Sequence, residues 1–183
     1  MNYIIERILL NPQTDLRFSG VLADLDDIRV LLRQLSPGKE KHLLSKFYEK
    51  HPAHLLIFGA RMGNRKKIDD ANETQDDGNG RIVSMATLSL VCSCHKQFGQ
   101  VHEVITDAFH RGKQHGRTTS LAHDVLQLLI DTACDMKLSY LELSSKPSRG
   151  KANSLYQDIG FELISQAVGD KGTNVYRLYL SQE

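Results

Sequence analysis

The sequence has few cysteines, and their number and spacing argue against two kinds of site. Its 183 residues include three cysteines, Cys92, Cys94 and Cys134. A small, odd number favours a reducing cytoplasm over a disulfide framework. Cys92, Cys94 and His95 offer possible metal ligands, but a structural zinc site usually takes four ligands from spaced pairs, and the sequence contains no second pair. We therefore expect no metal site and a cytoplasmic location.

The sequence also lacks an excess of either charge and any long apolar run. Lys and Arg number 23 and Asp and Glu number 22, for a net charge of +1. This balance removes the electrostatic basis for a general nucleic-acid or anionic-membrane binder. No apolar run approaches the ~18–20 residues of a membrane helix, and the first residues do not read as a signal peptide. We expect neither nucleic acid nor membrane among the partners.

The composition is that of one folded domain. Hydrophobic residues make up 40% and charged residues 25% of the chain, and its length fits one domain of roughly 100–200 residues. We predict an N-terminal arm or edge strand over residues 1–15 and a single domain over residues 16–183. Residues 61–80 are almost wholly polar between two apolar strands, which predicts a flexible loop insertion. A regulatory or substrate-gating loop is the alternative.

The periodicity of apolar residues predicts an α/β (α+β) domain with a mixed sheet. The first helix should begin at Asp24 as its N-cap and bury a stripe of apolar residues at helical spacing. The strand–helix–strand passage from Gln100 to Leu143 should place two parallel strands near the centre of an otherwise antiparallel sheet. The predicted strands are Leu16–Val21, 54–60, 81–91, Gln100–Thr106, Tyr140–Leu143, Phe161–Ile164 and Val175–Leu180. The predicted helices are 24–35, Glu40–Lys50, Arg117–Met136 and Ser148–Asp158.

A basic, glycine-containing turn precedes the long third helix. The turn runs from His110 to Gly116 and reads HRGKQHG. A helix N-terminus exposes unpaired N–H groups and the positive end of the dipole, so it suits a phosphate, and glycines allow close approach to the backbone. Arg111, Lys113 and Arg117 add positive charge. The run matches neither GxxxxGK[ST] nor GxGxxG. Taken alone, it fits a solvated loop equally well.

Two motifs in their strand and helix context resemble the GCN5-related N-acetyltransferase (GNAT) superfamily. The family's phosphate loop, R/Q-x-x-G-x-G/A, is matched from Arg111 to Gly116, with Gln114 in place of the middle glycine. Its second signature, A-x-x-x-Y-x-x-x-G-F, is matched in full by Ala152, Tyr156, Gly160 and Phe161. The element order agrees from Leu16 to Leu180, and the motifs lie between Gln100 and Phe161.

The resemblance implies direct transfer of an acetyl group from acetyl-CoA to a primary amine in a ternary complex. It also implies a mostly antiparallel sheet of about six to seven strands, flanked by about four helices, with its parallel pair splayed at the centre. A protonated amine cannot attack a thioester, so a base is useful. By strand alternation Glu103 shares a face with Val101 and Ile105, an apolar setting that would raise its pKa.

Glu103 is therefore the expected base, and a glutamate paired at a strand edge is the alternative. His102 and His110 are weaker candidates, since alternation points His102 to the other face. Tyr156 is the expected acid for the departing thiolate of CoA. A structural tyrosine that packs its ring against the cofactor is the alternative.

The resemblance also implies where CoA binds. Backbone groups of the Glu103 strand should bond the pantetheine arm, and amides of the basic turn should meet the phosphates. Arg149 and Lys151 carry charges suited to the adenosine 3′-phosphate. The predicted cofactor contacts are Val104, Ile105, Thr106, Arg111, Gly112, Lys113, Gln114, His115, Gly116, Arg117, Thr118, Arg149, Ala152 and Tyr156.

Two other readings stay open at this point. The same fold could be a non-catalytic acyl-CoA-binding or partner domain, or the chain could use residues 61–80 or 1–10 as an interaction segment. Small amines, amino acids, antibiotics and protein amines all remain as acceptors. A homodimer is possible, because many members of the family form one.

Overall fold

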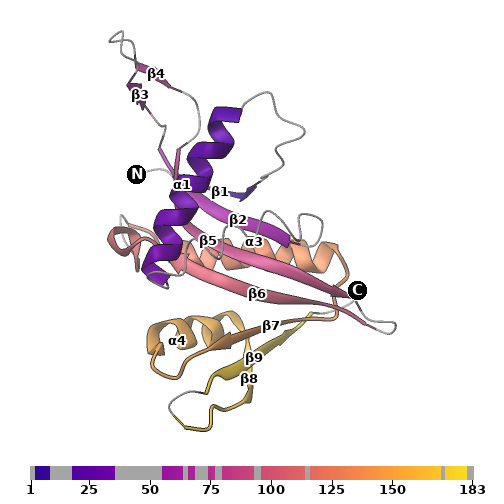
Figure 1. Cartoon of the computed structure of the whole chain (residues 1–183). Coiled ribbons are helices and arrows are strands. Elements are labelled where there is room, and N and C mark those ends of the chain that lie inside the picture. The colour runs from indigo at the N-terminus through magenta and orange to yellow at the C-terminus, as the bar shows by residue number, and fades with distance from the viewer. Residues whose placement is uncertain are drawn as a thin grey trace.

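A seven-stranded mixed sheet forms the centre of the molecule, in the strand order β1-β2-β5-β6-β7-β9-β8 (Figure 1). The structure is a computed structural model that describes residues 3–8, 18–35, 55–63, 66–68, 74–76, 80–92, 96–113, 116–169 and 172–180. Only the β6–β7 pair is parallel among the described strand pairs. This confirms the predicted mixed, mostly antiparallel sheet. The strands are β1 (Tyr3–Ile8), β2 (Leu55–Met62), β5 (Arg81–Cys92), β6 (Gln97–Thr106), β7 (Tyr140–Ser145), β8 (Glu162–Ser165) and β9 (Asn174–Tyr179).

Helices cover both faces of the sheet. Figure 1 shows α1 (Phe18–Leu35) in front of the sheet and α3 (Leu121–Asp135) behind it. α4 (Gly150–Ile159) shares the buried core of α3 through Tyr156, and a short 3-10 helix, η1 (Ala108–His110), follows β6. These are three α-helices where about four were expected, and the missing one, Glu40–Lys50, falls outside the described residues. No described helix combines the length and apolarity needed to span a membrane.

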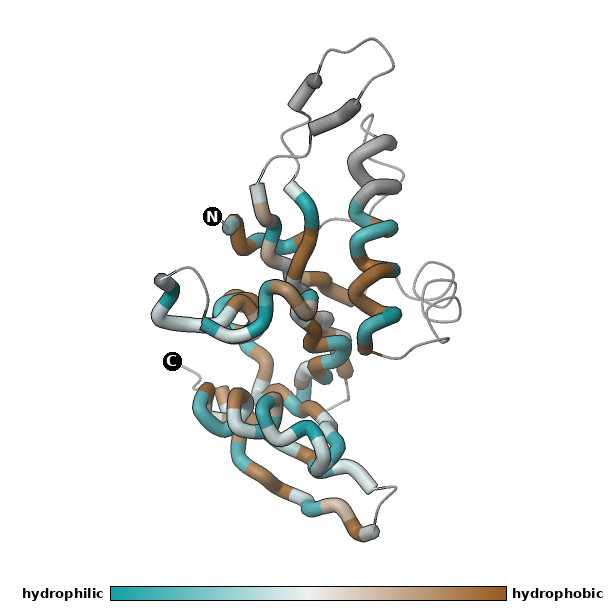
Figure 2. Tube along the Cα trace, turned by 90° about the vertical axis from the view of Figure 1, so that its left-hand side faces the viewer, coloured by the Kyte–Doolittle hydropathy of each residue, from teal (hydrophilic) through white to brown (hydrophobic). Residues whose placement is uncertain are grey.

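The sheet separates two hydrophobic cores. One core lies under α3 and α4 and includes Phe58, Leu88 and Leu129. The other lies under α1 and includes Ile28, Leu32 and further residues from β2, β5 and β6. The hydropathy of α1 alternates along its turns in Figure 2, as expected for a helix that buries one face. The stripe predicted at Ile28, Leu31, Leu32 and Leu35 is confirmed, since the first three are buried and Leu35 packs beside them.

Three predictions about individual elements were wrong, one in the type of element, one in a helix cap and one in a helix start. The segment predicted as a strand from Leu16 belongs, from Phe18 onward, to α1. In the sequence Phe18, Val21 and Leu25 continue the three-and-four spacing of the later stripe, and this spacing favours helix over strand. Asp24 therefore lies inside α1, where its carboxylate accepts hydrogen bonds of 2.6 and 2.7 Å from buried Arg61. α3 begins at Leu121 rather than Arg117, because Ser120 caps it by accepting from the His123 amide.

Parts of the polar segment 61–80 belong to strands. Arg61 belongs to β2, where it also pairs with Glu6 of β1. Further along the segment, β3 (Lys66–Ile68) and β4 (Thr74–Asp76) pair with one another and form a separate two-stranded sheet. The first strand of the chain, β1, pairs with β2 and forms one edge of the main sheet. Residues 3–8 therefore form an edge strand and not a free arm.

A bulge in β6 changes which way its side chains face. Thr87 of β5 pairs with His102 and Met85 pairs with Ile105, so Glu103 and Val104 together lie opposite Ala86. Glu103 has a φ of 46°, in the left-handed region that non-glycine residues seldom adopt. Val101 accordingly lies in the core under α3, whereas Ile105 lies in the core under α1. The prediction that Val101, Glu103 and Ile105 share one face was wrong, because it assumed an unbroken alternation.

The central parallel pair is short and then ends. β6 and β7 pair only from Gly99 with Leu141 to Val101 with Leu143. Both strands continue beyond this point, β6 to Thr106 and β7 to Ser145. The sheet is therefore open between them, which confirms the predicted splay.

Candidate functional site

A cavity of about 680 Å³ lies where β6 and β7 separate, between the end of β6, the start of α3 and α4. It brings together eight of the predicted cofactor residues from three separate parts of the chain. Lys113, Gly116, Arg117 and Thr118 do not line it, and Gln114 and His115 fall outside the described residues. Lys151 does line it. The eight are Val104, Ile105, Thr106, Arg111, Gly112, Arg149, Ala152 and Tyr156.

One wall of this cavity is the end of β6. No described strand pairs with β6 on its β7 side beyond Val101. Peptide groups on such an edge seek hydrogen-bond partners, and an extended ligand with amide groups can supply them. Two carbonyls on this stretch already accept side-chain hydrogen bonds, that of Thr106 from Nε of Arg111 over 2.9 Å and that of Ile105 from the Ser84 hydroxyl over 3.2 Å. The edge is suited to the amide-bearing arm that the sequence predicted there.

The start of α3 forms the next wall. Ser120, Leu121 and Ala122 border the cavity, so the positive end of the helix dipole is directed at it. Gly112 and Gly116, in the turn before the helix, have φ values of 83° and 75°. No atom lies within 4 Å of where a Cβ would stand at either position. Glycine is therefore required there by the backbone conformation and not by lack of space.

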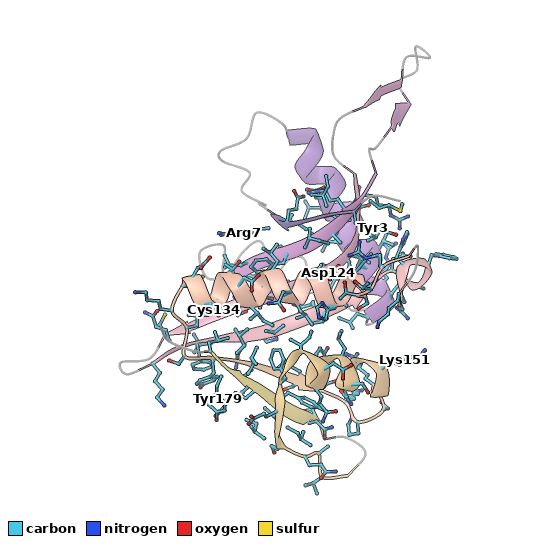
Figure 3. The ribbon with its side chains drawn as sticks, turned by 180° about the vertical axis from the view of Figure 1, so that it is seen from behind. Tyr3, Arg7, Asp124, Cys134, Lys151 and Tyr179 are labelled. Atoms are coloured by element: carbon cyan, nitrogen blue, oxygen red, sulfur yellow. The ribbon has the colours of Figure 1, made fainter. Side chains whose placement is uncertain are left out.

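The charge of Arg117 is already compensated. Its guanidinium forms an ion pair with Asp124 in the first turn of α3, and it lies 5.2 Å from the centre of the Tyr3 ring. Figure 3 shows Tyr3 and Asp124 near the same end of α3, with Lys151 across from them on α4. Tyr3 also lies 3.2 Å from Nδ1 of His110 through its hydroxyl. A direct contact from Arg117 to a phosphate stays a prediction, and Arg111 is the arginine of the basic turn that lines the cavity.

Sequence reasoning missed Gln34, which ties α1 to the basic turn. Its Nε2 donates to Asp107 over 2.9 Å, and its Oε1 accepts from the Ala108 amide over 3.0 Å. Burial alone would raise the pKa of the Asp107 carboxyl, but hydrogen bonds from Gln34 and the Phe109 amide bring it below its ordinary value. Asp107 therefore stays ionised and holds the start of the turn. The only signal in the sequence is a polar residue beside Leu35 at the end of an apolar stripe.

Tyr156 lies on the α4 side of the cavity and is almost fully buried, at 6% exposure. Its ring packs against Phe161 and Tyr176, with centroids 6.2 and 6.0 Å away. Burial raises the pKa of its phenol above the ordinary value, and the charge of Arg149 offsets only part of this rise. Tyr156 therefore keeps its proton at neutral pH and can donate it.

Glu103 faces a second, smaller cavity of about 190 Å³ and not the one that holds Tyr156. Thr87 donates a hydrogen bond to its carboxylate. Ala86 and Leu88, on either side of Thr87, lie in the core under α3, so Thr87 and Glu103 face the side of the sheet that carries α1. His102 lines the same cavity, which contradicts its prediction to the opposite face and follows from the bulge.

Two features named in the sequence lie apart from these cavities. His110, the last residue of η1, contacts Tyr3 of β1 and lines neither cavity. Cys92 is exposed at the end of β5, while Cys94 and His95 fall outside the described residues. In the part of the chain that the structure describes, no three His, Cys, Asp or Glu side chains gather as metal ligands would.

Comparison with known proteins gives matches to solved structures only; no family model and no curated protein sequence matches the chain. A protein of the GNAT family from Desulfovibrio desulfuricans superposes with a TM-score of 0.63 at 13% identity, over 98% of this chain and 100% of the other. The N-acetyltransferase from Staphylococcus aureus Mu50 gives 0.64 at 17%, over 99% and 100%. The NatC complex bound to Gag peptide and CoA gives 0.66 at 14%, over 99% and 100%. At these identities the likeness concerns architecture, and the chain has the fold of the GCN5-related N-acetyltransferases.

Proposed function

We propose that this protein is an acyl-CoA-dependent N-acyltransferase that moves an acetyl group from acetyl-CoA to a primary amine by direct attack. One observation carries the proposal. Consecutive residues of β6, Glu103 and Val104, line two different cavities at the point where the sheet opens. Because Val104 shares its cavity with Tyr156, the Glu103 carboxylate and the Tyr156 phenol lie on opposite sides of one opening in the sheet. This arrangement supports two substrates that meet in the sheet without a covalent enzyme intermediate.

The larger cavity suits the acyl-CoA. Peptide groups at the end of β6, beyond its pairing with β7, receive the amide-bearing arm, and the start of α3 with Arg111 receives the phosphates. Arg149 and Lys151, at the start of α4, supply further positive charge on the same cavity. The likeness to a NatC complex solved with CoA supports this assignment.

The smaller cavity suits the amine. An ammonium group there transfers a proton to Glu103, and the free amine attacks the thioester carbonyl carbon from the side of α1. A carbon–nitrogen bond forms and the carbon–sulfur bond breaks. Tyr156 donates its phenolic proton to the departing sulfur, and the amide nitrogen loses its remaining extra proton to solvent. Glu103 then releases its proton to solvent and Tyr156 takes one up from solvent, which returns both groups to their starting states with a net release of one proton. The products are an N-acetyl amine and free CoA.

Calorimetric titration of acetyl-CoA and desulfo-CoA tests the binding half of the proposal. Gly150 lines the cavity at the start of α4 with open space around its Cβ position, so Gly150→Glu adds a carboxylate there without a clash. The matched control is Ser154→Glu, which adds the same charge to the same helix at an exposed position outside the cavity. We expect Gly150→Glu to weaken binding at least about tenfold and Ser154→Glu to leave it unchanged.

A panel of primary amines, with release of the CoA thiol as the readout, tests the catalytic half. Turnover with at least one amine, at a rate well above thioester hydrolysis without amine, is the expected result. No binding of either CoA ligand would refute the proposal. Binding with no turnover across the panel would instead favour the non-catalytic acyl-CoA-binding domain.

A further inference from the structure

The cavity beside Glu103 has a second carboxylate, from Glu142 of β7. Leu141 and Leu143 are buried in the core under α3, so Glu142 between them faces the opposite side of the sheet. It stands beside Gln100 of β6 in the register of the parallel pair. Glu103 on β6 and Glu142 on β7 therefore lie on the same side of the sheet. Both line the cavity of about 190 Å³. No lysine or arginine is among the described residues that line it.

Arg177 lies opposite Glu142 on the neighbouring strand β9 and holds its carboxylate in place. Nη2 of Arg177 donates to one oxygen of Glu142 over 2.8 Å, and Nη1 reaches the Tyr179 hydroxyl over 3.3 Å. The guanidinium lies 4.4 Å from the centre of the Tyr140 ring, whose centroid is 4.7 Å from that of Phe98 in a stacked arrangement. Packed rings on the guanidinium restrict its motion, so Glu142 has a fixed partner.

The charges of these groups select the acceptor. Glu103, Glu142 and His102 are the titratable side chains among the described residues that line the cavity, and Arg177 offsets one of the two carboxylates without lining it, so the other carboxylate has no arginine or lysine partner there. An ammonium group is attracted into the cavity. A carboxylate carried on the carbon next to that ammonium would meet Glu103 and Glu142 at close range, and like charges at such range repel one another.

We propose that the acceptor is a cationic primary amine with no carboxylate beside its amino group, and that Glu142, oriented by Arg177, is the residue that sets this selectivity. The inference rests on the proposed function and names its substrate class. It admits alkyl amines, diamines and the amino groups of peptides, whose neighbouring carbonyl is an uncharged amide. It excludes free α-amino acids.

Matched acceptor pairs test the inference, each an amine and the same amine bearing an α-carboxylate: agmatine with arginine, and tyramine with tyrosine. The readout is kcat/KM for each acceptor with saturating acetyl-CoA. We expect the carboxylate-free member of each pair to be preferred at least about tenfold, which corresponds to about 1.4 kcal/mol. Two variants should move this preference in opposite directions.

Glu142→Gln should reduce the preference, because it removes a negative charge while its amide can still meet Arg177. Arg177→Met should increase it, because Glu142 loses its counter-ion. Asp158→Asn, at an exposed position of α4 away from the cavity, is the charge-matched control and should leave it unchanged. Unchanged affinity for acetyl-CoA in each variant shows that the protein is folded.

The outcomes separate this inference from the function on which it rests. Acetylation of both members of each pair at equal rates, or faster with the amino acids, overturns the selectivity while leaving the acyltransferase intact. A preference that neither variant alters overturns the role of Glu142 and Arg177. Failure of every amine refutes the proposed function itself.

Discussion

Replacing Tyr156 with Phe removes a single hydroxyl from the cavity and tests the acid step. The ring contacts with Phe161 and Tyr176 survive the change, so the fold should be retained. General acid catalysis typically contributes about 10²–10⁴-fold to a rate. The thiol of CoA has a reference pKa near ~8.5, so its thiolate already leaves readily, and the benefit should fall at the low end of that range. We expect kcat to fall about 10²-fold, equivalent to about 2.7 kcal/mol in the barrier.

The pH dependence gives a second, independent readout of the same residue. Burial holds the pKa of Tyr156 above its ordinary value of 10.0. In the proposed acid role the protonated form of Tyr156 is the active one, so we expect activity below this raised pKa and its loss as the pH rises through it. The wild-type rate should therefore show an alkaline limb above pH 10, and Tyr156→Phe should lack it.

Tyr176→Phe is the matched control, because it removes a hydroxyl from the same aromatic cluster. Tyr176 is 2% exposed, does not line the cavity, and uses its hydroxyl to accept from Asn174 over 3.3 Å. The control should lose about 1 kcal/mol of stability and keep its kcat. The assay is stopped-flow detection of free thiol, with affinity for acetyl-CoA measured separately. A kcat for Tyr156→Phe within about twofold of wild type at every pH would remove Tyr156 from the acid role, since a positioned acid contributes far more.

Three further changes test the other side chains of the site. Glu103→Gln should lower kcat about 10²-fold while leaving the affinity for acetyl-CoA unchanged; a kcat equal to that of the wild type would place the base elsewhere. Gln34→Ala should raise KM for acetyl-CoA at least about fivefold with kcat unchanged, because it removes two hydrogen bonds that hold the start of the basic turn, one of them to the ionised Asp107. Its control is Gln127→Ala, which loses an exposed bond to Asp131 on α3. Asp107→Asn should lower the free energy of unfolding by about 1–3 kcal/mol at neutral pH. The lowered pKa of Asp107 makes this contribution present above the ordinary value of 3.8 and lost as the pH falls through the folded value, so urea titrations of the two proteins should converge in acid.

Much of the fold follows from local patterns in the sequence. Alternation and apolar runs located β2, β5, β7 and β9 to within a few residues. The A-x-x-x-Y-x-x-x-G-F signature located the end of α4, where Gly160 takes a φ of 112° as the helix cap and the Phe161 amide returns to the Tyr156 carbonyl. These features depend on neighbours in the chain, which a single sequence displays.

What could not be predicted depends on contacts between distant segments. Gln34 meets Asp107 across 73 residues, and nothing near Gln34 in the sequence distinguishes it from an exposed helix residue. The buried pair of Arg61 with Asp24 likewise joins two elements whose facing positions only the fold defines. The sequence instead assigned Asp24 to a helix cap and Arg61 to a polar loop, because each assignment was sound for a residue judged by its neighbours alone.

The bulge at Glu103 shows why the one wrong alternation matters for function. In an unbroken strand Glu103 would share the face of Val101 and point toward the apolar side chains of the core under α3. The extra residue keeps Glu103 on the side of His102 and Thr87 and returns Val104 to the side of Tyr156. Holding a glutamate at a φ of 46° costs on the order of 1–3 kcal/mol. Hydrogen bonding to Thr87 and the burial of Ile105 under α1 offset that strain. The same distortion that breaks the period-two alternation thus places Glu103, the proposed base, on the side of the sheet opposite to Tyr156, the proposed acid.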